Sequence, residues 1–116
     1  MLPDNDDERK RIPLWTATIG YFPAAFMLLA KLGYDANEQH NPGEPVHWAR
    51  DKSTDHLNCA MRHLFDSLFL TREARLKVLT QVFWRIGAEI QTSYEELYGV
   101  EGNTTEFNAH TDNGVN

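Results

Sequence analysis

The chain has 116 residues, the usual length of a single domain and enough for one modest hydrophobic core. Hydrophobic residues make up 41% of it, which excludes a wholly disordered chain. The formal net charge of −6 excludes a generic binder of polymeric nucleic acid, because such a partner needs a basic surface. The single cysteine, Cys59, excludes an internal disulfide, so we expect a reducing, cytoplasmic location.

Residues 1–11 form a polar, charged leader. The segment that follows, 12–30, carries no charge and is almost long enough to span a membrane. It contains Pro13 and Pro23, however, and proline breaks the helical hydrogen-bond ladder where lipid offers no replacement partner. We therefore expect no membrane insertion here, but a loop that packs on the core, followed by a buried helix.

Two of the three helices that we expect lie on either side of a long connection. The first covers about 21–32, and Gly33 offers a C-terminal stop. The connection over 33–52 contains Pro42-Gly43 and Pro45, which make regular structure improbable. Ordered loops of this length are often functional, although disorder is the other common explanation. The second helix begins at residue 53 or 54, a serine and a threonine that are both good N-caps, and ends within 66–69.

The third helix is expected to start after Thr71 as N-cap and to stop near Tyr98, before Gly99. On its outside, Arg85 and Glu89 are spaced to form an ion pair. Apolar residues repeat along it every three or four positions: Leu76, Leu79, Phe83, Ile86, Ile90, Tyr94 and Leu97. A helix of this length spans about 40 Å. Because that is long for a lone small domain, we expect part of it to pack on another chain.

No segment alternates polar and apolar residues as a strand does, so the predicted fold is all-α. We expect a small helical bundle of about three main helices with a long ordered loop, completed by oligomerisation to a dimer or tetramer. The expected domain covers 12–100, and 101–116 reads as a flexible polar tail.

Two pairs of oxygen-bearing side chains are spaced to share a helix face: Asp35-x-x-Glu38 and Asp55-x-x-Asn58. If the two pairs lie on neighbouring helices, four side chains point at one place. Hard cations such as Mg²⁺ or Mn²⁺ prefer such oxygen ligands. The alternative is a solvated acidic face, with Asp55 favoured in the first turn of its helix by the helix dipole.

Cations cluster around the start of the second helix. Arg50 and Lys52 precede its N-terminus, and Arg62 lies two turns along the face of Asp55, so the three are spaced to hold a polyphosphate. The alternative is ordinary ion pairing with neighbouring aspartates, Asp55 among them.

The connection also carries residues suited to a nucleobase. Trp48 is able to stack on a base, and the polar side chains before it are able to hydrogen-bond the base edge: Asn37, Gln39, His40 and Asn41. The alternative is that Trp48 simply packs the loop onto the core.

Histidines offer two further interpretations. His56 and His63 share a helix face and are suited to act as a general base, a phosphate donor or a metal ligand; alternatively they are partly buried and hydrogen-bonded. A zinc site from His40, His47, Cys59 and His63 is conceivable, but the spacing matches no standard zinc pattern.

Three stretches of the chain form a distinctive set: Tyr21-Phe22-Pro23-x-Ala25, then Asn37-Glu38-Gln39-His40-Asn41-Pro42-Gly43-x-Pro45-x-His47-Trp48-x-Arg50-x-Lys52-Ser53-x-Asp55-His56, and then Arg62-His63-Leu64. Together they resemble the phage-type dATP/dGTP diphosphohydrolases, small relatives of the MazG-like all-α pyrophosphatases. The resemblance covers about 12–95.

The resemblance implies Mg²⁺- or Mn²⁺-dependent hydrolysis of a (deoxy)purine nucleoside triphosphate, dGTP or dATP, to the monophosphate and pyrophosphate. It implies metal ligands at Asp35, Glu38, Asp55 and Asn58, or alternatively at Glu38 and Asp55 with another acid such as Asp51 or Asp66. It also implies catalytic roles for Glu38, Asp55 and His56. The substrate-binding residues would be Gln39, His40, Asn41, Trp48, Arg50, Lys52, Arg62 and His63.

Two positions depart from the ExxE and ExxD motifs of the MazG-like enzymes: Asp35 replaces a Glu, and Asn58 replaces the final Asp. The neutral oxygen of Asn58 would hold a metal more weakly. A non-catalytic nucleotide- or metal-binding protein, or a phage–host interaction protein, is therefore the alternative. In either case we expect a homo-oligomer in the cytoplasm (of the host cell, if the chain is phage-encoded), with no membrane and no polymeric nucleic acid as partner.

Overall fold

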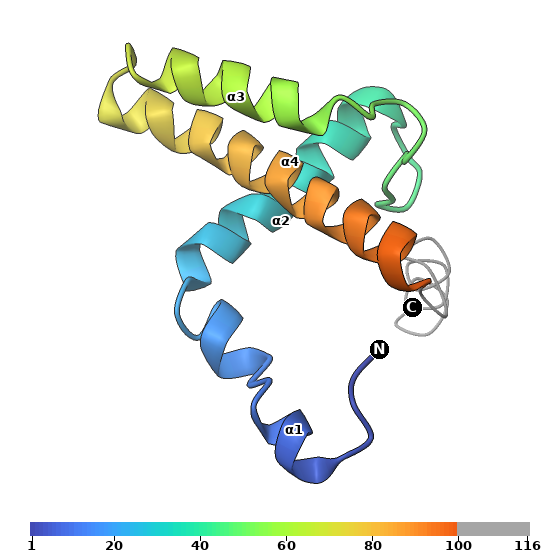
Figure 1. Ribbon diagram of the computed structural model, residues 1–116. Coiled ribbons are helices and arrows are strands. Elements are labelled where there is room, and N and C mark those ends of the chain that lie inside the picture. The colour runs from blue at the N-terminus through green and yellow to red at the C-terminus, as the bar shows by residue number, and fades with distance from the viewer. Residues whose placement is uncertain (100–116) are drawn as a thin grey trace.

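A computed structural model describes residues 1–99, which form helices joined by loops and contain no strand (Figure 1). Three long helices dominate: α2 (Pro23–His40), α3 (His56–Ser67) and α4 (Arg72–Tyr98). Two short elements precede them, α1 (Asp6–Lys10) and a π-helical turn, η1 (Trp15–Ile19). The predicted all-α class with three main helices is confirmed. The predicted tail over 101–116 lies outside the described residues.

Helices α3 and α4 form an antiparallel hairpin with a tight turn (Figure 1). The Thr71 hydroxyl accepts a hydrogen bond from the Ala74 amide, so the predicted N-cap of α4 is confirmed. The Arg75 guanidinium donates to the carbonyls of Ser67, at 2.9 Å, and Leu70, at 3.2 Å. These bonds fasten the end of α3 and the turn that follows it to the first turn of α4. At the far end of α4, Gly99 adopts a φ of 61°, which suits glycine, and α4 ends at Tyr98 as predicted.

Helix α2 lies against the opposite side of α4, where the rings of Phe26 and Phe83 pack edge to face at 5.6 Å. The helix does not stop at Gly33 but continues to His40, so the predicted boundary is wrong. Gly33 lies in a helical turn with open space around it, and a glycine there only weakens the helix. The connection is consequently 41–55 rather than 33–52.

Helix α3 begins at His56, a little later than the predicted start at residue 53 or 54. Asp55 occupies the N-cap position, but its side chain does not cap the helix. Its carboxylate accepts hydrogen bonds from Asn58, at 2.9 Å, and Arg62, at 3.3 Å. The end of α3 at Ser67 lies within the predicted range.

The N-terminal segment, residues 1–22, extends away from the α3–α4 hairpin (Figure 1). Asn5 caps α1 by accepting from the amides of Asp7 and Glu8. Among the described helices, η1 contacts only α2, and Trp15 is 71% exposed. The predicted packing of this segment on the core is therefore wrong. No single helix among the described residues is long and apolar enough to cross a membrane, and only a pair bent by 76°, 6–19 with 23–40, passes that test.

The three main helices enclose very little apolar volume. Among the described residues the buried hydrophobic side chains are Ala60 and Ala88, and no large side chain is fully buried. The predicted buried helix is also wrong in this respect, because the only buried residue of α2 is the polar Asn37. Most large apolar side chains of α3 and α4 remain open to solvent.

Candidate functional site

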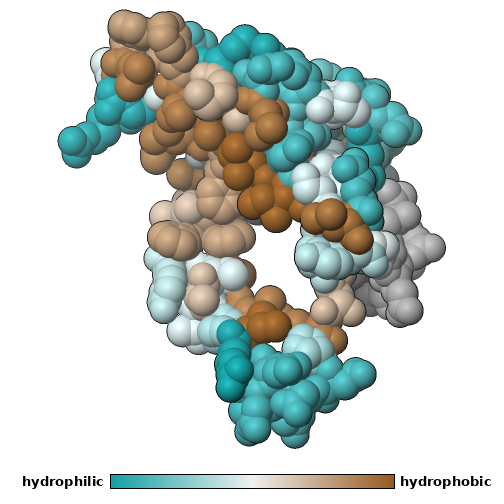
Figure 2. Space-filling view, in the orientation of Figure 1, coloured by the Kyte–Doolittle hydropathy of each residue, from teal (hydrophilic) through white to brown (hydrophobic). Residues whose placement is uncertain are grey.

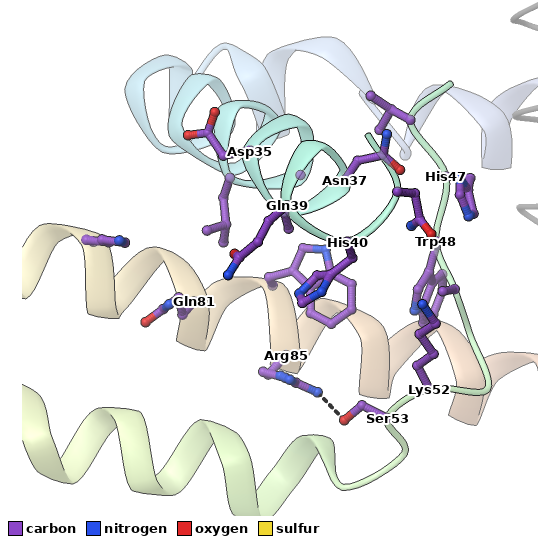
Figure 3. A pocket seen from close by; sticks show the side chains of 18 of the residues that line it. Asp35, Asn37, Gln39, His40, His47, Trp48, Lys52, Ser53, Gln81 and Arg85 are labelled. Carbon is purple, nitrogen blue, oxygen red and sulfur yellow. Dashed lines mark hydrogen bonds between the residues drawn. The ribbon is translucent and has the colours of Figure 1, made fainter. Parts of the chain in front are cut away.

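A pocket of about 720 Å³ opens between the C-terminal half of α2, the loop 41–55 and the middle of α4 (Figure 3). Its volume falls in the range of about 300–1,000 Å³ that is typical of small-molecule sites. Nine residues that the sequence analysis selected line it: Asp35, Asn37, Gln39, His40, Asn41, His47, Trp48, Lys52 and His63.

Helix α4 supplies lining residues that the sequence analysis missed: Lys77, Gln81, Trp84 and Arg85. They recur at helical spacing on the side of α4 that turns away from its apolar stripe. The helical spacing of these residues was the sequence signal that would have predicted a second, functional side of α4. It was passed over because the interpretation of α4 concentrated on the stripe and treated Arg85 as an outward-facing residue.

Positive charge predominates in the pocket. Lys52, Lys77 and Arg85 contribute three fixed cations, while Asp35 is the one carboxylate in the lining. The Asp35 carboxylate is already paired with Lys31, one turn earlier on α2, at 2.9 Å. Three histidines, His40, His47 and His63, add groups that are able to donate hydrogen bonds. The lining therefore suits an anion with several oxygens.

Arg85 joins α4 to the start of α3. Its Nη1 donates to the Ser53 hydroxyl at 2.7 Å (Figure 3) and to Nδ1 of His56 at 3.2 Å. The predicted pair with Glu89 is wrong, since no such ion pair occurs in the described part of the chain. Both acceptors of Nη1 are uncharged, so these two hydrogen bonds do not neutralise the positive charge of the guanidinium.

His56 lies beneath the pocket lining and is only 4% exposed. Burial lowers the pKa of its imidazole below the usual 6.5, and the neighbouring Arg85 lowers it further, while Glu89 and Asp55 partly offset the shift. The ring is therefore neutral near pH 7 and accepts from Arg85 at Nδ1. His56 does not line the pocket, so it supports the site rather than reaching into it, and the partly buried, hydrogen-bonded alternative holds for it.

Aromatic rings form the floor of the site. The indoles of Trp48 and Trp84 meet edge to face at 5.8 Å, and the ring of His56 lies 6.4 and 5.8 Å from them. Trp48 thus both packs the loop onto α4 and lines the pocket, combining the two interpretations of it.

Arg50, which was predicted to hold phosphate, lies outside the pocket lining. Its guanidinium stacks 4.3 Å from the centre of the Trp48 ring and bonds to Glu95 on α4 at 2.5 Å. A hydrogen bond from Gln91, and then the bond and charge of Arg50, lower the pKa of the Glu95 carboxyl. Both charged side chains are about one-fifth exposed. Arg50 therefore fastens the loop to α4.

Asn37 shapes the beginning of the loop. Its side chain is buried, and its amide nitrogen donates to the Glu44 carbonyl at 2.8 Å. Its carbonyl oxygen has no hydrogen-bond partner among the described residues. The turn between them contains Gly43, whose φ of 80° favours glycine. Asn37 thus holds the wall of the pocket and is one of its lining residues.

The expected convergence of metal ligands does not occur within one chain. Asp35 lines the pocket beside Lys31, whereas Asp55 and Asn58 bond to each other on the exposed side of α3, and Glu38 is absent from the lining. No group of three or more His, Cys, Asp or Glu residues among the described ones could hold a metal ion, which also removes the zinc alternative in this chain. Arg62 pairs with Asp55, as the ion-pairing alternative supposed.

Comparison with protein-family models, with curated proteins and with solved structures found no match. The function is therefore argued from the pocket and from the residues that line it.

Proposed function

We propose that this chain binds a nucleoside triphosphate in the pocket between α2, the loop 41–55 and α4. The activity implied by the sequence resemblance is hydrolysis to the monophosphate and pyrophosphate with Mg²⁺ or Mn²⁺. The observation that carries the proposal is the meeting of three fixed cations with two tryptophans around one cavity. A polyphosphate joined to an aromatic base is the small-molecule class that such a lining complements.

In this proposal Lys52, Lys77 and Arg85 bind the phosphates. Arg85 is the strongest of the three, because its planar fork is able to grip phosphate oxygens in pairs and its charge is not neutralised by a carboxylate in the described structure. The histidines His40 and His63 add donors at the rim.

The base lies against the indoles of Trp48 and Trp84, since an aromatic face attracts a base of any identity. The side chains of Gln39, Asn41 and Gln81 offer amide donors and acceptors to its edge. A purine presents the larger stacking area, and a purine is what the resemblance implies.

Catalysis would require groups beyond one copy of the chain. The residues that the resemblance names as metal ligands do not fit a divalent cation here, because Asp35 and the Asp55–Asn58 pair have separate partners. We propose that a homo-oligomer, located in the cytoplasm, supplies the missing ligands from a second copy. The same separation of carboxylates favours the second candidate function, a non-catalytic nucleotide-binding protein.

Two measurements separate these functions. Titration with dATP or dGTP, followed by calorimetry, tests binding; release of pyrophosphate in the presence of Mg²⁺ or Mn²⁺ tests hydrolysis. An enzyme shows both, and Glu38→Gln and Asp55→Asn each reduce turnover by orders of magnitude, while Glu73→Gln, an exposed carboxylate in the first turn of α4, leaves it unchanged. Binding without pyrophosphate release would favour the non-catalytic function. The absence of both would refute the proposal.

A further inference from the structure

The pocket extends lengthwise along one side of α4. Lys77, Gln81 and Trp84 lie at helical spacing on that side, and all three line the pocket. Lys77 and Trp84 are within about 20° of each other around the helix and about 10 Å apart along its axis. The apolar stripe of α4, which Figure 2 shows as a band from the tip of the hairpin along the helix, lies on the other side, with Ile86 about 180° from Lys77.

The end of the pocket near Trp84 holds the two indoles and two of the three cations. The ring of Trp48 meets that of Trp84 edge to face at 5.8 Å. Arg85 follows Trp84 directly in α4. Its guanidinium donates to the Ser53 hydroxyl at 2.7 Å, so the neighbouring Lys52 lies at this end as well (Figure 3). A base stacked on the indoles would therefore place the phosphate nearest the sugar beside Arg85 and Lys52.

The opposite end of the pocket brings Lys77 together with His63 of α3. Helix α4 is bonded to the first residue of α3, His56, at 3.2 Å, and to the last, Ser67, at 2.9 Å. Because the two helices are antiparallel, His63 lies level with the turn of α4 that carries Lys77. Both residues line the pocket, so this end has a fixed cation and an imidazole that is able to donate a hydrogen bond.

No acid neutralises Lys77 in the described part of the chain, where it forms no ion pair. Glu73 precedes it by one helical turn, at the spacing of an ion pair, but the two side chains do not pair. Asp35, the one carboxylate in the lining, is bonded to Lys31 at 2.9 Å, and Figure 3 shows it directed away from α4. The Lys77 ammonium is therefore free of competing carboxylates when an anion enters the pocket.

From this layout we infer that Lys77 and His63 form a subsite for the terminal phosphate of the nucleotide, and that Lys77 selects triphosphates over monophosphates. The inference rests on the proposed function. A sugar and three phosphate groups extend over a length comparable to the separation of Trp84 and Lys77, so a triphosphate whose base stacks on the indoles reaches the subsite. A monophosphate ends beside Arg85 and Lys52 and leaves the subsite empty. The pocket thus distinguishes nucleotides by the length of their phosphate chain.

Calorimetric titration of the full chain with dATP and with dAMP, in the absence of divalent metal so that neither is hydrolysed, tests the inference. The original chain is expected to bind dATP at least about 10-fold more tightly than dAMP, as for one added charge-assisted contact. Lys77→Gln should lower the affinity for dATP at least about 10-fold and leave that for dAMP unchanged. His63→Ala should give the same selective loss on a smaller scale, at least about 3-fold.

Three further variants separate selection from general effects of charge. Lys77→Arg keeps the cation and should keep the preference for dATP. Arg85→Gln removes a cation from the other end of the pocket and should weaken both nucleotides. Arg72→Gln, at the start of α4 and outside the pocket lining, should leave both affinities unchanged.

The outcomes distinguish the inference from the proposed function. If Lys77→Gln weakens dATP and dAMP equally, weakens neither, or behaves like Arg72→Gln, the inference is overturned while the proposed function stands. If the original chain binds neither nucleotide, the proposed function itself is refuted, and the inference with it. Because the Lys77 side chain is exposed, an unchanged melting temperature is expected for Lys77→Gln and confirms that the variant is folded.

Discussion

The guanidinium of Arg85 and the imidazole of His56 are joined by a hydrogen bond of 3.2 Å between Nη1 and Nδ1. The bond connects the middle of α4 to the first residue of α3, and the same Nη1 also holds the loop at Ser53. Since His56 accepts this bond as a neutral ring, the arrangement depends on its protonation state. Neither Ser53 nor a neutral His56 places a negative charge on the Arg85 guanidinium, which lines the pocket.

Acid is expected to destabilise the fold through His56. Its pKa is lowered by burial and by Arg85, so below about pH 6.5 the unfolded chain binds the proton more readily than the folded chain. The contribution of His56 to stability is complete above about pH 6.5 and is lost as the pH falls toward its folded pKa. Denaturant unfolding between pH 7 and pH 5 is expected to show a shallower loss of stability in His56→Gln than in the original chain. His40→Gln, on an exposed side chain, is the control; if His56→Gln and the original chain lose stability equally, the assignment is wrong.

Alanine substitutions at two glycines, one inside α2 and one at the end of α4, are expected to change stability in opposite directions. Gly33 lies inside α2 with no atom within 4 Å of an added Cβ, so Gly33→Ala is expected to increase stability by about 0.5–1 kcal/mol. Gly99 follows α4 with a φ of 61°, so Gly99→Ala is expected to decrease stability by about 1 kcal/mol or more. Thermal or urea unfolding measures both. A loss of stability in Gly33→Ala would show that α2 ends there, as the sequence alone suggested.

The comparison of these two glycines explains which boundaries are readable from sequence. At the start of α4 the Thr71 hydroxyl caps the helix, and at its end Gly99 adopts a positive φ. Both residue types are typical of these positions, so both ends of α4 were predicted correctly. Position 33 is also a glycine, but its backbone is helical and does not need a positive φ. Helix α2 continues through it to His40, and the residues after Gly33 line the pocket. A single sequence gives no way to distinguish the two cases.

The candidate site was predictable only in part for a related reason. The loop and the end of α2 concentrate polar residues in one stretch, and nine of the selected residues do line the pocket. The contribution of α4 depends on which side of that helix meets the loop, and this is a tertiary property. Arg50 and Asp55 were assigned to ligands because of their charge, whereas the structure gives each an ion-pair partner, Glu95 for Arg50 and Arg62 for Asp55.

The bond between Arg50 and Glu95 is expected to hold the loop closed against α4. A double-mutant cycle with Arg50→Gln and Glu95→Gln should give a coupling energy of about 1–2 kcal/mol, since the pair is largely shielded from water and charge-assisted. Either single substitution should also increase proteolysis within 41–55. Lys31→Gln with Asp35→Asn, an exposed pair on α2, is the matched control and should couple by no more than about 0.5 kcal/mol. A coupling for Arg50 and Glu95 as small as that of the control would contradict this role.

Binding of a nucleoside triphosphate is the central claim, and a calorimetric titration of the chain and of Arg85→Gln with dATP and dGTP tests it most directly. Arg72→Gln, an equal charge change at the start of the same helix and outside the pocket, is the control. We expect the original chain and the control to bind the triphosphate much more tightly than the unphosphorylated deoxynucleoside, and Arg85→Gln to bind it at least about 10-fold more weakly, as for loss of a bidentate phosphate contact. No binding by the original chain, or equal binding by Arg85→Gln and Arg72→Gln, would contradict the account.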